Sequence, residues 1–151
     1  MQTQQIEYFD IEIVGTKNVE VLVQFLNDVT GKVEPFWIGR MDEETKARFF
    51  AKFNDPETLR IGFNSNKFDM PILGIILEGY SNRNVQEAAE ALITAGTPHW
   101  RVLRDYEATP PDWNHIDLYE VAPGVQISLK TYAGRLAFPT MVEHTIVGKA
   151  S

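Results

Sequence analysis

Asp10 and Glu12 stand two residues apart inside the apolar stretch YFDIEIVG, residues 8–15. In a β-strand, residues i and i+2 point to the same face, so this stretch predicts that both carboxylates share one face. Two carboxylates side by side in apolar surroundings raise each other's free energy unless a positive charge lies between them. The pattern therefore indicates either a cation site or an edge strand whose acids face solvent while the alternate apolar residues are buried.

Asp69 is the third candidate, in the stretch GFNSNKFDMPIL, residues 62–73. The apolar run 69–79 predicts a buried helix, and an Asp and a Pro are both favourable in its first turn. Such an Asp is often no more than a helix-capping acid. A strand pair and a helix-start carboxylate converging from different elements would, however, supply the oxygen ligands that Mg²⁺ takes, as phosphodiester hydrolysis by two divalent cations requires.

The two stretches together resemble two motifs of the DEDD exonuclease superfamily, which includes the proofreading 3′–5′ exonuclease domains of DNA polymerases. FDIE at 9–12 is similar to the first motif, F-D-x-E, and the run from Asn64 through Phe68, Asp69, Pro71 and Leu73 is similar to the second. Each motif alone is weakly specific. Both in the same order, on a predicted strand and a predicted helix start, make a more specific match that extends by pattern over roughly residues 6–139.

What the resemblance implies is a metal-dependent 3′–5′ exonuclease with an α/β, ribonuclease H-like mixed sheet flanked by helices. Asp10, Glu12 and Asp69 would be the catalytic residues and would hold Mg²⁺ or Mn²⁺. Asn64 and Phe68 would bind the substrate, the end of a single-stranded DNA or an RNA.

The family's third motif supplies a fourth carboxylate from a later helix, and no match to it is present. After Glu120 the only acid is Glu143, and in the tail VEHTIVGKAS the five residues after His144 lead to Lys149, where an acid is needed. Asp117, in a predicted strand, can approach the site, although a surface Asp is the simpler interpretation. The chain is therefore either an exonuclease truncated at its C-terminal end or a catalytically impaired relative that binds nucleic acid or a protein partner. An unrelated acidic interaction protein is the third alternative.

Composition limits the other function classes. The chain has 151 residues, 44% of them hydrophobic, which suits one domain spanning 1–151 with a core of its own. A net charge of −7 argues against a protein that coats nucleic acid by bulk electrostatics, but not against an enzyme that meets phosphates through metals. There are no cysteines, no membrane-spanning run and no signal-peptide pattern, so we expect a cytoplasmic protein without a membrane partner.

Hydrophobic periodicity predicts an order of strands and helices that suits a mixed sheet. The expected strands are 6–14, 19–26 and 33–39 in an antiparallel meander, then 58–65 and 115–121. The expected helices are 42–55, 69–79, 84–96 and 127–136. Residues 97–114 show little periodicity and are expected to form a long loop, where Trp100 and Trp113 either stack on bases or fill a local core.

Overall fold

The computed structural model describes residues 5–120, so the helix expected at 127–136 and the candidate residues of the C-terminal tail lie outside the described residues. The described part is an α/β structure with a five-stranded mixed sheet, as predicted. Its strands are β1 (Ile6–Val14), β2 (Glu20–Asn27), β3 (Val33–Trp37), β4 (Leu59–Gly62) and β5 (Asn114–Asp117).

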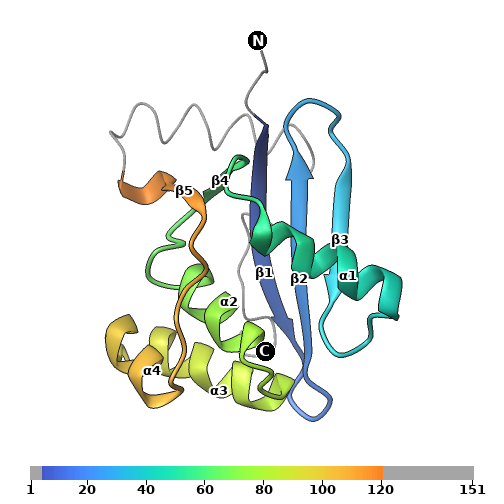
Figure 1. Ribbon diagram of the computed structural model, residues 1–151. Coiled ribbons are helices and arrows are strands. Elements are labelled where there is room, and N and C mark those ends of the chain that lie inside the picture. Colours follow the sequence, from blue (N-terminus) through green and yellow to red (C-terminus); the bar gives the residue numbers. More distant parts are fainter. Residues whose placement is uncertain (1–4, 121–151) are drawn as a thin grey trace.

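The strand order is β3-β2-β1-β4-β5, and β1 is the central strand (Figure 1). β1, β2 and β3 form the predicted antiparallel meander, while β4 and β5 run parallel to β1. The turn between β2 and β3 is closed by Asn27, whose Oδ1 accepts hydrogen bonds from the Val29 and Thr30 amides, both at 2.9 Å. Gly31 follows with a φ of 70°, a conformation in which glycine has no steric penalty.

The described residues form four α-helices, which are α1 (Glu43–Ala51), α2 (Asp69–Leu77), α3 (Asn82–Ile93) and α4 (His99–Asp105). Side chains cap two of them, because Asp42 accepts from the Thr45 amide at 2.7 Å and Ser81 accepts from the Asn84 amide at 3.2 Å. Short 3₁₀ turns follow α1 at Lys52–Asn54 and β5 at Leu118–Glu120.

Two expectations from the sequence are wrong. The loop expected at 97–114 contains α4, a helix of 7 residues in which only Val102 is buried. One buried residue gives no hydrophobic repeat, so the sequence pattern did not indicate this helix. The strand expected at 115–121 ends at Asp117, where the chain turns into the 3₁₀ segment. The observed order therefore has three helices between β4 and β5 where two were expected.

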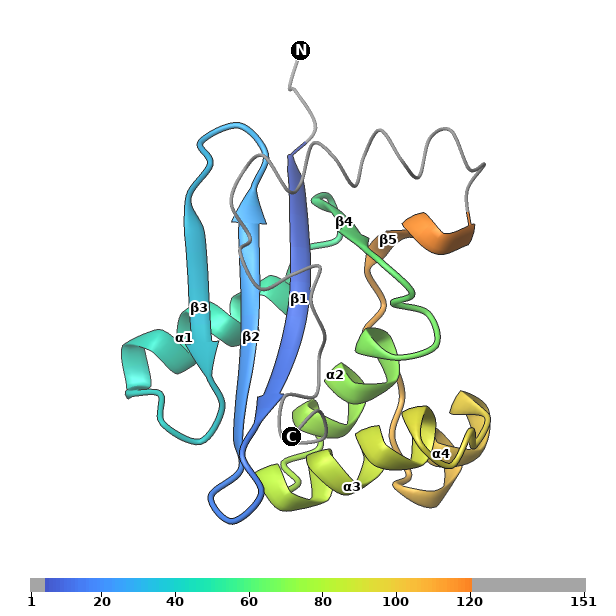
Figure 2. The same ribbon diagram turned by 180° about the vertical axis from the view of Figure 1, so that it is seen from behind.

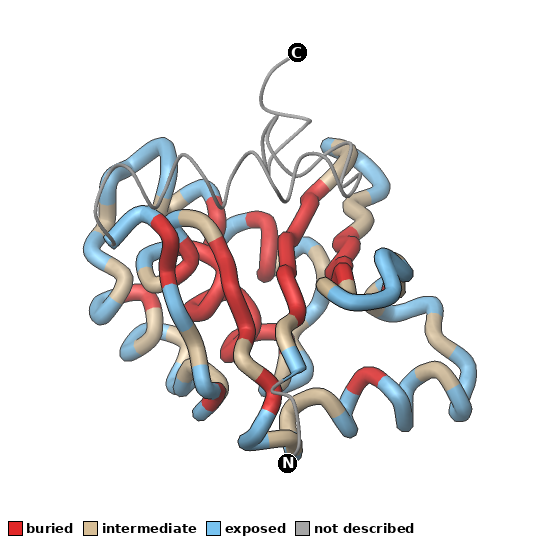
Figure 3. The backbone as a smooth tube through the Cα atoms, turned by 90° about the horizontal axis from the view of Figure 1, so that it is seen from above, coloured by how far each residue is buried: buried red, intermediate tan, exposed pale blue. Residues whose placement is uncertain are grey.

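All four α-helices pack against the same face of the sheet (Figures 1 and 2). This face carries Phe9, Ile11 and Ile13 of β1, which are fully buried and belong to one cluster with side chains of every helix. Tyr8 lies on the opposite face of β1, in a smaller cluster with Leu26, Ile61 and Leu118. Buried residues follow the central strands in Figure 3, so β1 is buried along both faces.

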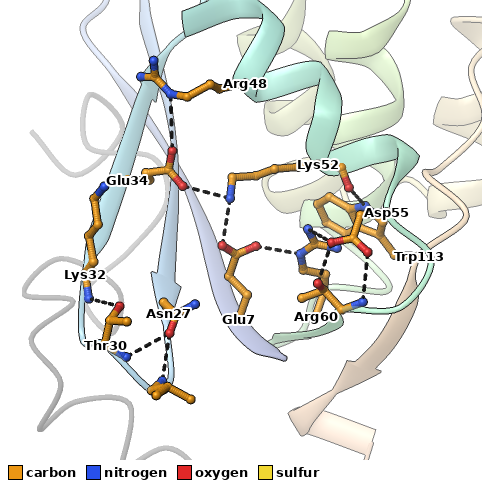
Figure 4. A network of polar contacts seen from close by, with 12 residues as sticks. Glu7, Asn27, Thr30, Lys32, Glu34, Arg48, Lys52, Asp55, Arg60 and Trp113 are labelled. Carbon is orange, nitrogen blue, oxygen red and sulfur yellow. Dashed lines mark hydrogen bonds and ion pairs between the residues drawn. The ribbon is translucent and has the colours of Figure 1, made fainter. Parts of the chain in front are cut away.

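A buried network of charged side chains lies on the helix face, at the amino end of β1 (Figure 4). Glu7 accepts from Arg60 Nε and from Lys52 Nζ, both at 2.8 Å, and Lys52 also pairs with Glu34 at 3.0 Å. The Arg60 guanidinium lies 4.8 Å from the centre of the Trp113 ring, and the Trp113 indole donates to the Lys52 carbonyl. Trp113 is thus a core residue, one of the two alternatives that the sequence left open.

No helix among the described residues is long and apolar enough to cross a membrane.

Candidate functional site

Asp10 and Glu12 lie side by side on the face of β1 that carries Tyr8. They are 5% and 8% exposed, and β1 is hydrogen-bonded on one side to β2 and on the other to β4. The alternative in which β1 is an edge strand with solvent-facing acids is therefore wrong. Two carboxylates are instead buried in the central strand of the sheet.

The chain reaches Asp69 through a tight turn after β4. β4 pairs only with Ile6–Tyr8 of β1, so no strand within residues 5–120 pairs on that side with the part of β1 that carries Asp10. At Gly62 a Cβ atom would lie 2.6 Å from Ser65 Cβ and 2.9 Å from Phe9 Cζ, so a side chain at this position would force its neighbours to move. The Met70 amide then donates to the Ser65 carbonyl at 2.8 Å, and α2 begins at Asp69.

Electrostatic coupling shows that the three predicted carboxylates lie near one another. Burial, then the charges of Asp69 and Glu12, raise the pKa of Asp10 to about 9, against a small opposing effect of a backbone hydrogen bond. Burial raises the pKa of Asp69 well above its usual value as well, and the charge of Asp117 adds to this. Asp10 Oδ2 is buried and has no hydrogen-bond partner among the described residues.

Asp117 is the site residue that sequence reasoning assigned to the surface, and that assignment is wrong. It is 5% exposed, ends β5, and is close enough to Asp69 to raise the pKa of that carboxyl. Its Oδ2 accepts from the Asn66 amide at 3.0 Å and its Oδ1 from the Tyr119 amide at 2.9 Å. The sequence signal that could have identified Asp117 is its position at the carboxyl end of a strand that runs parallel to β1, because ligand sites commonly lie at such strand ends.

His115 fixes the turn beneath the carboxylates. Its Nε2 lies 2.7 Å from the Ser65 hydroxyl, and Ser65 is fully buried, so this hydroxyl is not available as a nucleophile. Burial lowers the pKa of His115, and the nearby Asp117 and Glu120 partly oppose this. The pair therefore holds the 62–68 turn to β5 and so helps to position Asp69.

The two predicted substrate-binding residues differ in exposure. Phe68 is 6% exposed and packs in the main hydrophobic core just before α2. Asn64 is exposed on the turn, with a φ of 56° that Asn tolerates better than most residues. Contact of either residue with a substrate stays a prediction.

The donor chemistry of this site suits a hard divalent cation. Carboxylate oxygens are the ligands that Mg²⁺ prefers, and the buried Asp10 Oδ2, which has no hydrogen-bond partner within residues 5–120, is available as a ligand atom. Among residues 5–120, however, no three His, Asp or Glu side chains are already arranged as a metal-binding group. Asp10, Glu12 and Asp69 thus fit a cation by chemistry and proximity rather than by a preformed coordination shell.

No family model, no curated protein and no solved structure matches this chain.

Proposed function

We propose that the chain is a metal-dependent 3′–5′ exonuclease that hydrolyses the ends of single-stranded DNA. Asp10 carries this proposal, because its carboxyl lacks a partner among the described residues and because burial, and then the charges of Asp69 and Glu12, raise its pKa. A cluster of mutually repelling buried acids contributes little to a stable core, whereas it is well suited to binding divalent cations. These three residues are also those of the two exonuclease-like sequence motifs.

The sheet supports a ribonuclease H-like fold as part of this proposal. Its order, with three antiparallel strands followed by two parallel ones, brings the carboxyl ends of β4 and β5 beside the part of β1 that carries Asp10. Asp69 follows β4 and Asp117 ends β5, and the charge of Asp69 acts on Asp10 while the charge of Asp117 acts on Asp69. Such strand ends are the usual position of ligand sites in open α/β sheets.

Asp10, Glu12 and Asp69 would hold Mg²⁺ or Mn²⁺. When bound, such ions activate a water molecule and stabilise charge on the attacking and leaving oxygens. We propose Asp117 as a fourth carboxylate beside Asp69, where the backbone amides of Asn66 and Tyr119 orient its side chain. Since the chain has no cysteine, it suits a reducing cytoplasm, and we propose that it acts there.

Hydrolysis of an end-labelled single-stranded DNA in Mn²⁺ tests this function. Asp10→Asn and Asp69→Asn should each lower the rate more than about 100-fold, since even outer partners of metal ligands contribute about 10–100-fold. Asp105→Asn is the matched control, because the Asp105 side chain is 57% exposed on α4, and its rate should stay unchanged. Equal rates in the parent protein and both site variants would overturn the proposal.

The second candidate is a catalytically impaired exonuclease-fold protein that binds nucleic acid or a protein partner. The sequence lacks the family's fourth acid, and both oxygens of Asp117, its substitute, already accept backbone hydrogen bonds. Stabilisation by Mn²⁺ that depends on Asp10, without any hydrolysis of single-stranded DNA or RNA, would favour this candidate over the enzyme.

A further inference from the structure

A pocket lies at the end of the sheet to which β1 runs, and none of the candidate carboxylates lines it. It has a volume of about 340 Å³ and lies between the β1–β2 turn, the segment after β3 and the start of α3. Three basic residues, Lys17, Arg40 and Arg83, line it together with the exposed Trp37 and a single acid, Glu20. The whole chain has 14 Lys and Arg against 21 Asp and Glu, so a mainly basic pocket lies in a chain that is acidic as a whole.

Side chains of α3 hold the walls of the pocket in place. The Arg83 guanidinium donates to the Thr16 carbonyl at 2.7 Å and to the Lys17 carbonyl at 2.8 Å, which ties the β1–β2 turn to the helix. Asn82 Nδ2 donates to the Val19 carbonyl at 3.3 Å and to the Ile38 carbonyl at 3.1 Å. These bonds join both walls to α3, so little ordering is needed when a ligand binds.

The side chains of Arg40, Trp37 and the exposed Lys17 remain for the ligand. Arg40 is 70% exposed and forms an ion pair with Glu20 through Nη2, which leaves most of the five N–H donors of its guanidinium free for a phosphate. Trp37 is 38% exposed at the end of β3 and offers part of an indole face. An aromatic face beside cationic donors is the arrangement that binds single-stranded nucleic acid, through base stacking and phosphate contacts.

Sheet register connects this pocket with the candidate active site. Glu12 is paired with Leu22 across β1 and β2, and Leu22 is paired with Trp37 across β2 and β3. Residues paired directly across antiparallel strands point to the same face, so Glu12 and Trp37 lie on one face, two strands apart. With about 4.8 Å between strands, their backbones are about 10 Å apart.

We propose that this pocket binds one nucleotide of a single-stranded nucleic acid whose end lies at the carboxylates, with its base stacked on Trp37 and its phosphate held by Arg40 and Lys17. The inference rests on the proposed function for its choice of ligand. It adds a binding site on β3 and the β1–β2 turn, away from the two motifs that the sequence singled out.

Binding without hydrolysis tests the inference. Fluorescence anisotropy of labelled oligo(dT), and of oligo(U) in a parallel series, is measured in EDTA, so that metal binding and cleavage do not contribute. Trp37→Ala should weaken binding of at least one of the two strands about 5- to 100-fold. Arg40→Gln, at an exposed position that is safe for folding, should weaken binding and lower the salt dependence by about 0.7 in log–log slope.

Trp100→Ala and Arg104→Gln are the matched controls. Trp100 is 58% exposed on α4 and the Arg104 guanidinium lies 5.5 Å from its ring, so this pair offers the same chemistry away from the pocket. The controls should bind like the parent protein. Unchanged affinity in Arg40→Gln, no binding by the parent, or losses confined to the α4 variants would overturn the inference.

The outcomes separate this inference from the proposed function. If metal-dependent hydrolysis depends on Asp10 but the Trp37 and Arg40 variants bind nucleic acid like the parent, the pocket inference is overturned and the proposed enzyme function is supported. If those variants bind more weakly but the protein hydrolyses neither DNA nor RNA, the pocket inference is supported and the proposed enzyme function is overturned.

Discussion

At Asp10, burial and the repulsion of two neighbouring carboxylates act in the same direction. The pKa of this group is raised from 3.8 to about 9, so between these values the native protein holds a proton that the unfolded chain has released. The free energy of unfolding must then fall as the pH rises through this range, by at most about 1.4 kcal/mol per pH unit for one proton. The stability that protonated Asp10 contributes is complete only at acidic pH.

Asp10→Asn should remove this pH dependence in the metal-free protein. The variant keeps the shape of the side chain without a charge, so its advantage over the parent should grow from about pH 5 to about pH 9. Urea denaturation in EDTA at several pH values measures the difference. A constant difference across that range would mean that Asp10 ionises normally, and that the carboxylates are not coupled in the metal-free state.

Glu7 is the residue on which the buried charge network depends. Glu7→Gln would remove two ion pairs at once. Within the described part of the chain, the guanidinium of Arg60, which is 2% exposed, would then have Asp55 at 3.7 Å as its one remaining ion-pair partner. Breaking a buried pair in this way should lower the free energy of unfolding by about 3–5 kcal/mol. Glu43→Gln is the control, because the Glu43 side chain is 94% exposed and its pair with Lys46 should contribute less than about 1 kcal/mol. Similar effects of the two substitutions, measured by urea denaturation, would contradict a structural role for the network.

Among the elements, α2 must be held firmly, because its first residue is Asp69. Gly74 lies in the middle of α2, and a Cβ atom there would overlap the Thr109 carbonyl oxygen and lie 2.8 Å from its carbon. The segment before β5 therefore packs directly on the backbone of α2. This contact fixes the helix relative to the strand that ends in Asp117.

Gly74→Ala should destabilise the protein although alanine is the better helix former. Helix propensity alone favours Ala by about 1 kcal/mol, but overlap with a backbone group in a packed interior costs about 1–3 kcal/mol. The net effect, from thermal or urea unfolding, should be a loss. Ala47→Gly at an exposed position of α1 measures the propensity effect alone. A gain in stability for Gly74→Ala would show that the 109–110 segment moves aside easily.

For the whole molecule, a divalent cation should stabilise the native state. At a free concentration about 100 times the dissociation constant, a ligand that binds only the native protein adds about 2.7 kcal/mol. For a chain of 151 residues this corresponds to a rise in Tm of about 5–10 °C. Differential scanning fluorimetry with Mn²⁺ or Mg²⁺ should show this rise in the parent protein, while Asp10→Asn and Asp69→Asn should show little of it. An equal shift in the parent and both variants would place the cation elsewhere.

The sequence alone determined the parts of the site that depend on local geometry. The two-residue period of a strand decides that Asp10 and Glu12 share a face, and the apolar run after Asp69 decides that this residue begins a helix. The meander was predictable for the same reason, since its strands are adjacent along the chain. The short α4 was not, because one buried residue leaves no periodic signal.

Only the tertiary structure decided which distant residues join them. Asp117 approaches Asp69 because β5 pairs with β4 across more than 50 residues of chain, and no local pattern encodes that pairing. Trp37 shares a face with Glu12 only in the observed register, and a slip of one residue would turn its side chain to the other face. Charge and burial at the site therefore depend on strand order and register, which are set by the packing of the whole sheet.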